Sequence, residues 1–179
     1  RLLAAPRKFD KLWRRDRALL ELLYATGCRA SEVSLLRLSD VHLNEGYCRC
    51  RGKGDKERIV PLGGRAIAAV QDYLHHERHE IAKHSPAAHS WLLLTARGLR
   101  LRRERIWELV KRYAVRAQAP SSIGPHTLRH SFATHMLDLF PFLGDVKILR
   151  QWAGLCDMTP DFSPSMGTTP VKGFYLDAG

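Results

Sequence analysis

The chain has 179 residues, which suits one domain or one domain with an additional fragment. Hydrophobic residues make up 45% and charged residues 26%, so the chain can bury a core and is not a disordered tail. No apolar run approaches the roughly 20 residues that a membrane-spanning helix needs, and no signal-peptide pattern opens the chain. We therefore expect a cytoplasmic protein without a membrane partner.

Charge is the first indication of function. The 29 Lys and Arg exceed the 18 Asp and Glu, and the net charge of +11 suits a polyanion such as nucleic acid. A basic surface without such a partner is the alternative on charge alone. Residues 1–135 contain 26 basic and 13 acidic side chains, whereas residues 136–179 contain 3 and 5. All nine His lie at or before His135. The composition therefore changes near residue 135.

The four cysteines include no C-x-x-C pair. They are Cys28, Cys48, Cys50 and Cys156. Without a secretory signal, this usage indicates reduced thiols rather than a disulfide framework.

The predicted elements are mostly helical. Residues 16–26 place Leu19, Leu20, Leu22 and Leu23 on one helical stripe, and Gly27 suits the left-handed stop that follows. Alternation over residues 47–51 predicts a strand that returns over 57–62 after a turn at 52–55. The further helices are predicted at residues 30–36, 65–83, 102–117 and 125–136. The fold class is therefore mainly α with a small antiparallel β-sheet.

Three segments carry a recognisable pattern. They are residues 22–33, LLYATGCRASEV, followed by LRLSD at 36–40; residues 52–62, GKGDKERIVPL; and residues 125–135, PHTLRHSFATH. In this order and spacing they resemble the catalytic domain of the tyrosine recombinase or phage integrase family, most closely its Xer-type members. The resemblance covers residues 1–135 and implies the recombinase catalytic-domain fold.

The resemblance implies a chemistry for five residues. In that family a tyrosine hydroxyl attacks a DNA phosphodiester, and two arginines stabilise the charge of the transition state. The motif match assigns these arginines to Arg29 and Arg129, the general acid to Lys53 and the histidine that assists proton transfer to His126. Glu32, three residues after Arg29, is expected to orient that arginine. Neither a metal nor another cofactor is expected.

Each assignment also has a plainer interpretation. Arg29 could be a surface residue after a helix cap, Lys53 a solvated hairpin tip and His126 a capping residue. His126, His130 and His135 could suggest a metal site, but acidic partners are missing. A further run of arginines fits contact with the DNA backbone, although a solvated helix start would look the same. This run consists of Arg97, Arg100, Arg102, Arg103 and Arg105.

After His135 the family pattern fails. The family expects a Gly-His or a Trp about 26 residues beyond the first histidine of its box, and the nucleophilic tyrosine about 35 beyond it. The first count falls on Trp152 and the second on Asp161. Tyr175, which lies some 14 residues further on, is the only later tyrosine. Trp152 and Tyr175 are therefore weak candidates for the site, and we expect the chain to lack its nucleophile.

Residues 136–179 resemble another family. The stretches LRQWAGLCDMTPDFSP at 149–164 and PVKGFYLDAG at 170–179 are similar to part of the flavin-dependent sarcosine oxidase β-subunit. No dinucleotide-binding βαβ unit precedes them, so they cannot hold a flavin by themselves. We therefore expect two parts, an incomplete recombinase catalytic domain at 1–135 and a foreign tail at 136–179.

The sequence favours site-specific DNA recombination by transesterification as the ancestral function. The expected partners are double-stranded DNA and other recombinase protomers, in the nucleoid. A catalytically dead DNA-binding remnant is the alternative. A flavin amine oxidase is a third reading, which the missing βαβ unit and the basic first 135 residues oppose.

Overall fold

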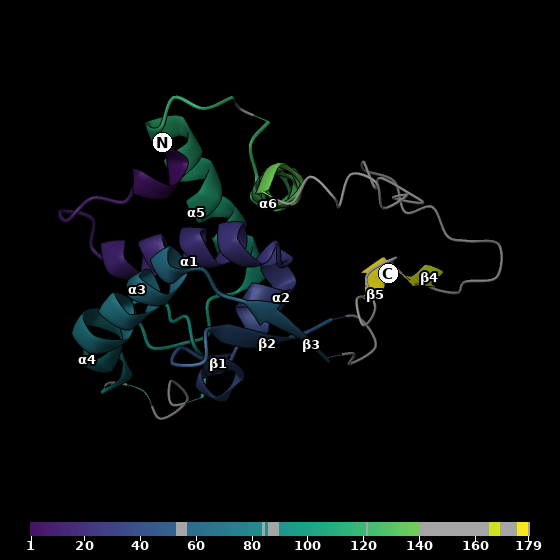
Figure 1. Cartoon of the computed structure of the whole chain (residues 1–179). Coiled ribbons are helices and arrows are strands. Elements are labelled where there is room, and N and C mark those ends of the chain that lie inside the picture. Colours follow the sequence, from purple (N-terminus) through teal and green to yellow (C-terminus); the bar gives the residue numbers. More distant parts are fainter. Residues whose placement is uncertain are drawn as a thin grey trace. The chain divides into compact units, whose positions relative to one another are not determined.

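The structure is a computed structural model (Figure 1). It describes residues 1–52, 57–83, 85, 90–120 and 122–139, and the strands at 165–168 and 175–178. For Ala133, residues 135–139 and the two late strands, only the backbone is described. The chain divides into two compact units, Arg1–Ala133 and Thr134–Gly179.

A buried helix, α1 (Trp13–Thr26), forms the centre of the first unit. Its leucines at 19, 20, 22 and 23 are fully buried, and it packs against α3 (Gly64–Tyr73). Gly27 ends α1 in the left-handed conformation, as predicted. The helix begins three residues earlier than the sequence indicated. Arg15 lies in this extra turn with its side chain buried against Asp16, a pairing that a stripe of leucines does not reveal.

Three antiparallel strands form the sheet in the order β1 (Val41–His42), β2 (Tyr47–Arg51) and β3 (Glu57–Pro61). Cys48 and Cys50 of β2 are buried, whereas the alternate arginines of the strand are exposed. The predicted antiparallel pair of strands is confirmed, with a returning strand one residue shorter, whereas residues 53–55 of the predicted turn lie outside the described residues. The sequence analysis missed β1, since two residues are too few to show a period.

The helix predicted at 65–83 is interrupted. It consists of α3, a π-helical segment η4 (Leu74–Arg78) and α4 (His79–Ala82). A π-turn adds one residue to the helical repeat and so changes the face on which later side chains lie. The buried guanidinium of Arg78 donates to the carbonyls of Trp91 and Leu92.

Three further helices are described, the last of which leads out of the first unit. A short helix α2 (Ala30–Leu35) packs against α5 (Arg103–Arg116), which also contacts α1. The last, α6 (Pro125–Leu139), begins in this unit and continues past the unit boundary. Short 3-10 turns lie at Leu2–Ala4 (η1) and Leu38–Asp40 (η2). The mainly helical fold with a small antiparallel sheet is thus confirmed.

Two strands are described in the second unit. They are β4 (Ser165–Thr168) and β5 (Tyr175–Ala178), which pair antiparallel. Across the described residues, no helix has both the length and the apolar character needed to cross a membrane.

Candidate functional site

A close contact joins the end of α1 to α6. Gly27 has a φ of +58°, and a Cβ atom added there would lie 2.6 Å from Cδ1 of Phe132. A larger residue would therefore be excluded both by the backbone conformation and by the ring. Arg29 follows Gly27 by two residues, and Arg129 lies three residues before Phe132 on α6. The contact thus holds the two segments that carry the predicted arginines against each other.

Arg29 caps the start of α2. Its backbone N–H donates to Oε2 of Glu32 at 2.7 Å, and its Nη1 lies 3.4 Å from Oε1 of the same carboxylate. The side chain of Arg29 is 42% exposed, whereas that of Glu32 is 4% exposed. Glu32 therefore contacts both the backbone and the guanidinium of Arg29, and its role in orienting Arg29 for catalysis stays a prediction.

The main partner of Glu32 is an arginine that the sequence pattern did not indicate. Arg58 of β3 binds both carboxylate oxygens, with Nη1 at 2.9 Å from Oε1 and Nη2 at 2.8 Å from Oε2. Burial alone would raise the pKa of Glu32, but hydrogen bonds from Arg58 and from the Arg29 backbone hold it below its ordinary value. The bond to Glu32 also raises the pKa of Arg58. Arg58 lies on the same face of β3 as buried Val60, and no pattern within the strand indicates its partner, which lies 26 positions earlier in the chain.

Arg129 has an incomplete set of partners. Its Nη1 is buried and has no hydrogen-bond partner among the residues that the structure describes. Burial, and next the positive charge of Arg29, lower the pKa of Arg129. Glu32 and Arg58 are also close enough to affect that pKa. Arg29 and Arg58 contact the Glu32 carboxylate, and Arg129 lies near enough for their charges to act on it, an arrangement that favours an added anion.

His126 lies in the first turn of α6, with its side chain exposed. Its ring is 5.5 Å from that of Trp107, centroid to centroid, at a tilt of 60°. Gly124 lets α6 begin this close to α5, since a Cβ atom there would lie 2.8 Å from Trp107. His126 precedes Arg129 by three residues, so the two share a face of the helix.

Three of the predicted site residues have no described side chain. Lys53 and Trp152 lie outside the described residues. Tyr175 opens β5, where its backbone is in register with Thr168. The predicted convergence of Lys53 with the arginines and His126 thus stays a prediction.

The tentative arginine run makes mostly local contacts. Arg103 pairs with Glu104 at 3.6 Å, and Arg105 pairs with Glu108 at 2.5 Å, all on exposed parts of α5. Arg102 is the residue before that helix, and the guanidinium of Arg100 lies 5.0 Å from the Trp91 ring centroid. These contacts fit a solvated helix start, and DNA contact by this run stays a prediction.

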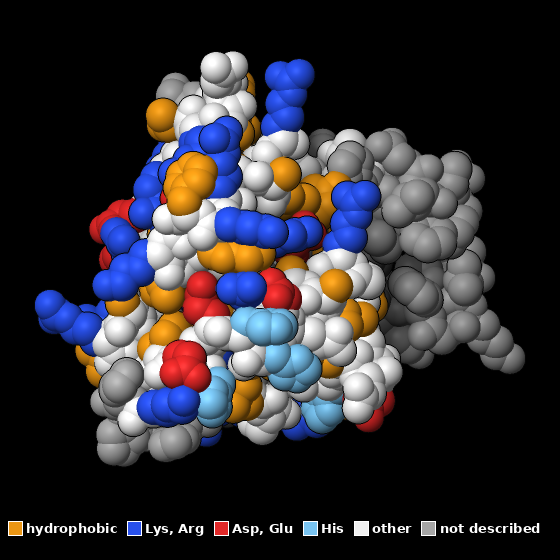
Figure 2. Space-filling view, turned by 90° about the vertical axis from the view of Figure 1, so that its left-hand side faces the viewer, with side chains coloured by type: hydrophobic (Ala, Val, Ile, Leu, Met, Phe, Trp, Pro, Cys, Tyr) orange, Lys and Arg blue, Asp and Glu red, His pale blue; other side chains and the backbone are white. Residues whose placement is uncertain are grey.

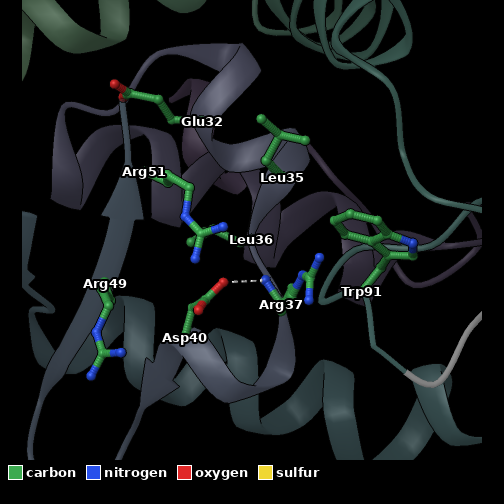
Figure 3. A pocket seen from close by; sticks show the side chains of 8 residues that line it. All are labelled: Glu32, Leu35, Leu36, Arg37, Asp40, Arg49, Arg51 and Trp91. Atoms are coloured by element: carbon green, nitrogen blue, oxygen red, sulfur yellow. Dashed lines mark hydrogen bonds between the residues drawn. The ribbon is translucent and has the colours of Figure 1, made fainter. Parts of the chain in front are cut away.

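A small pocket of about 110 Å³ lies beside Glu32. Figure 3 shows Arg49 and Arg51 of β2 on one side of it and Arg37 beside Trp91 on the other. Two of the charges here are paired, since Arg51 donates to Glu57 at 2.8 Å and Arg49 lies 3.8 Å from the same carboxylate, while the Arg37 guanidinium lies 5.3 Å from the Trp91 ring centroid. In the view of Figure 2, basic side chains likewise alternate with carboxylates. Unlike the surroundings of Arg129, this pocket shows no unpaired buried donor among the described side chains.

The described residues provide no metal site, since no three His, Cys, Asp or Glu are grouped to hold an ion.

Solved structures define the class of this fold. The crystal structure of XerA recombinase matches with a TM-score of 0.66 at 30% identity, over 78% of this chain and 47% of that one. The structure of XerH bound to difH substrate, a pre-cleavage complex, matches with a TM-score of 0.66 at 27% identity, over 82% of this chain and 43% of that one. The lambda integrase catalytic core shares the fold at 16% identity, with a TM-score of 0.57 over 78% of this chain and 79% of that one. The fold is that of tyrosine recombinase catalytic domains.

Sequence relatives identify the family. The profile of the Phage integrase family matches residues 1–139, so the chain belongs to this family. It is 40% identical over 158 residues to tyrosine recombinase XerD of Halalkalibacterium halodurans, with 88% of this chain and 51% of that protein covered. It is 46% identical over 153 residues to XerD of Bifidobacterium longum, with 84% and 49% covered. The chain thus spans about half the length of these relatives, and an alignment of 158 residues extends past residue 139 wherever it begins.

Proposed function

We propose that the first unit holds a DNA phosphate between Arg29 and Arg129, as the core of a site-specific tyrosine recombinase. The Nη1 of Arg129, buried and without a partner among the described residues, carries this proposal. A buried donor without an acceptor is unfavourable by about 1–3 kcal/mol, and a phosphate oxygen would remove that penalty. Arg29 brings a second positive charge to the same place. Two guanidiniums suit a phosphodiester, since each donates two parallel hydrogen bonds to its oxygens.

The same residues fit the transesterification that this family performs. A tyrosine oxygen would attack phosphorus, and the bond to the 5′-oxygen would break with transfer of a proton from Lys53. Arg29 and Arg129 would stabilise the charge that grows on the non-bridging oxygens, with His126 assisting at the phosphate. Glu32, held by Arg58, would keep Arg29 oriented. The reaction needs no metal in this scheme, because the arginines supply the positive charge.

We further propose that this chain does not complete the reaction by itself. The family spacing puts Asp161 where the nucleophile belongs, and Tyr175 lies further along the chain in β5. A departure from the family pattern within residues 136–179, part of which the XerD alignment still covers, would explain the missing tyrosine. The chain would then be a DNA-binding remnant of a recombinase. A flavin enzyme is not favoured, since the described residues contain no parallel βαβ unit.

The proposed partners are double-stranded DNA and further recombinase protomers. The XerH structure is a complex with its difH DNA substrate, which supports a DNA partner for this related fold. The site of action would be the nucleoid in the cytoplasm.

The nucleophile proposal is tested with a suicide substrate, a duplex with a nick beside the scissile phosphate. Because the target sequence is unknown, related Xer sites and a library of duplexes serve as substrates. On a denaturing gel the chain should give no covalent protein–DNA band. A band that disappears in Tyr175→Phe would contradict the proposal. As the positive control, a chimera carrying a recombinase C-terminus with its tyrosine in place of residues 136–179 should form the band.

The DNA-binding proposal is tested separately by fluorescence anisotropy with a labelled duplex at increasing salt. Neutralising about five phosphates predicts a slope near −4.5 for log K against log salt concentration, with little sequence preference. A flat response, or no binding at low salt, would exclude a DNA-binding surface.

A further inference from the structure

Three buried thiols lie beneath the arginine site. The Sγ atoms of Cys28 and Cys50 are 3.0 Å apart, and those of Cys48 and Cys50 are 3.6 Å apart. Cys48 and Cys50 lie on the same face of β2, since side chains two residues apart in a strand point the same way. Cys28 comes from the junction between α1 and α2, directly before Arg29. The cluster therefore brings thiols from two separate parts of the chain into contact.

The surroundings of Cys28 fix its position. Its backbone N–H donates to Oγ1 of Thr26 at 3.1 Å, and the hydroxyl of Thr26 donates to the Leu22 carbonyl at 2.6 Å. Nη2 of Arg58 lies 3.6 Å from the Cys28 sulfur. The thiol is thus held between the end of α1 and the sheet, facing Cys50.

We propose that Cys28 and Cys50 are a redox pair that forms a disulfide bond across this junction. A disulfide requires an S–S bond of about 2.05 Å, so formation of the bond brings the two sulfur atoms about 1 Å closer together. The alternative pair, Cys48 with Cys50, is two residues apart in one strand. There the Cα atoms are separated by about 6.6 Å, near the upper limit for a disulfide. The geometry therefore selects Cys28.

The reaction requires a two-electron oxidant, for which we name a small peroxide. Two S–H bonds break and one S–S bond forms, while the peroxide O–O bond is reduced and takes the two protons as water or alcohol. The contact with Cys28 lowers the pKa of Cys50, but the contact with Cys48 and burial outweigh it and raise that pKa to about 12. The hydrogen bond to Cys50 and burial also raise the pKa of Cys28. Both thiols are protonated at neutral pH, so the oxidation is slow and needs hours of exposure.

Two consequences follow for the oxidised chain. The residue before Arg29 becomes covalently tied to β2, next to the strand that carries Arg58. The disulfide also closes a loop of about 22 residues in the unfolded chain, which raises the melting temperature by about 5 °C or more.

Trypsin separates all four cysteines and so provides the test. Cleavage after Lys and Arg puts Cys28 in residues 18–29, Cys48 in 38–49, Cys50 in the dipeptide 50–51 and Cys156 in 151–172. The folded full-length chain is incubated with hydrogen peroxide, alkylated in denaturant and digested. We expect the dipeptide 50–51 linked to residues 18–29, a link that dithiothreitol removes. The same treatment in guanidinium chloride should give a mixture of pairings.

Matched variants complete the experiment. Cys48→Ser keeps the proposed pair and should give the same link and the same rise in melting temperature, whereas Cys50→Ser should give neither. The inference is independent of DNA binding. Full alkylation of Cys28 and Cys50 after oxidation, or links mainly to Cys48, to Cys156 or between chains, would overturn it. Peptide mapping of the oxidised wild-type chain tests the Cys28–Cys50 pairing even if a serine variant fails to fold.

Discussion

Two buried carboxylates of the first unit contact arginines, and they differ in how completely the buried donors near them are paired. Asp16, at the start of α1, accepts hydrogen bonds from Arg15, Arg112 and the hydroxyl of Tyr113. The remaining Nη1 donor of Arg15 binds the Leu94 carbonyl at 3.0 Å. Glu32, beyond the other end of α1, binds Arg29 and Arg58, while Nη1 of nearby Arg129 has no described partner.

The difference separates a structural cluster from a candidate binding site. Around Asp16 the buried donors of the cluster are satisfied within the fold, so the cluster joins α1 to α5 and stabilises the native state. Near Glu32, by contrast, the buried Nη1 of Arg129 has no partner among the described residues, and burial and next the charge of Arg29 lower the pKa of Arg129. An unpaired buried donor destabilises the isolated domain, and an anion would satisfy it. Three predictions test this contrast, in order of decreasing effect.

Replacing Asp16 should have the largest effect. Asp16→Asn removes the negative charge that neutralises buried Arg15, and loss of one partner of a buried pair is unfavourable by about 3–5 kcal/mol. The free energy of unfolding from urea titration should fall by that amount. Asp10→Asn, at a partly buried pair with Arg116, is the control and should lose clearly less. Equal losses of unfolding free energy in the two variants would contradict the larger structural contribution of Asp16.

Arg129→Met should separate stability from binding. The variant removes a buried, incompletely paired guanidinium, so the free energy of unfolding should stay within about 1 kcal/mol or rise. Affinity for duplex DNA should fall by about tenfold or more, since charge-assisted hydrogen bonds are lost.

Arg112→Met is the matched control for Arg129→Met, because it removes the same charge from the Asp16 cluster. It should lower stability and leave the DNA affinity nearly unchanged. The opposite outcome, with Arg129→Met unstable and still binding, would mean that Arg129 serves the fold.

The smallest expected effect is the pH dependence of the stability that Glu32 contributes. Its pKa is lowered in the folded chain, so its contribution to stability is present above the unfolded value of about 4.5 and is lost as pH falls through the folded pKa. The stability difference between the wild type and Glu32→Gln should therefore be constant from pH 7 to about 5 and shrink below about 4.5. Urea titrations at several pH values measure it. A difference that grows on acidification would contradict the lowered pKa.

Local patterns predicted most of the elements. The leucine stripe of α1, its glycine stop and the alternation of β2 follow from periodicity within a few residues of the chain. The π-turn at Leu74–Arg78 was not predictable in this way, because it accompanies contacts from Arg78 to carbonyls 13 and 14 residues further on. The segment after residue 90 was also missed, since its bridges join Arg37 to Trp91 and Leu94 to Arg100 without forming a regular strand.

The candidate site, too, was only partly predictable from the sequence. The order and spacing of three motifs indicated Arg29, Arg129 and Glu32, and the comparisons confirm the family to which those motifs belong. Arg58 was missed, although it lies within the second motif, because its role depends on a carboxylate 26 residues earlier. The thiol cluster was missed for the same reason, since the C-x-C spacing of Cys48 and Cys50 says nothing about Cys28.

The sequence by itself determined the family, the order of the helices and the hairpin, and the chemical types in the site. These depend on short-range spacing and on the intrinsic properties of side chains. Only the tertiary structure decided which charges are neutralised. Neutralisation depends on distance and burial across segments far apart in the chain, as where Phe132 of α6 packs on Gly27 and Arg129 comes within reach of the charge of Arg29.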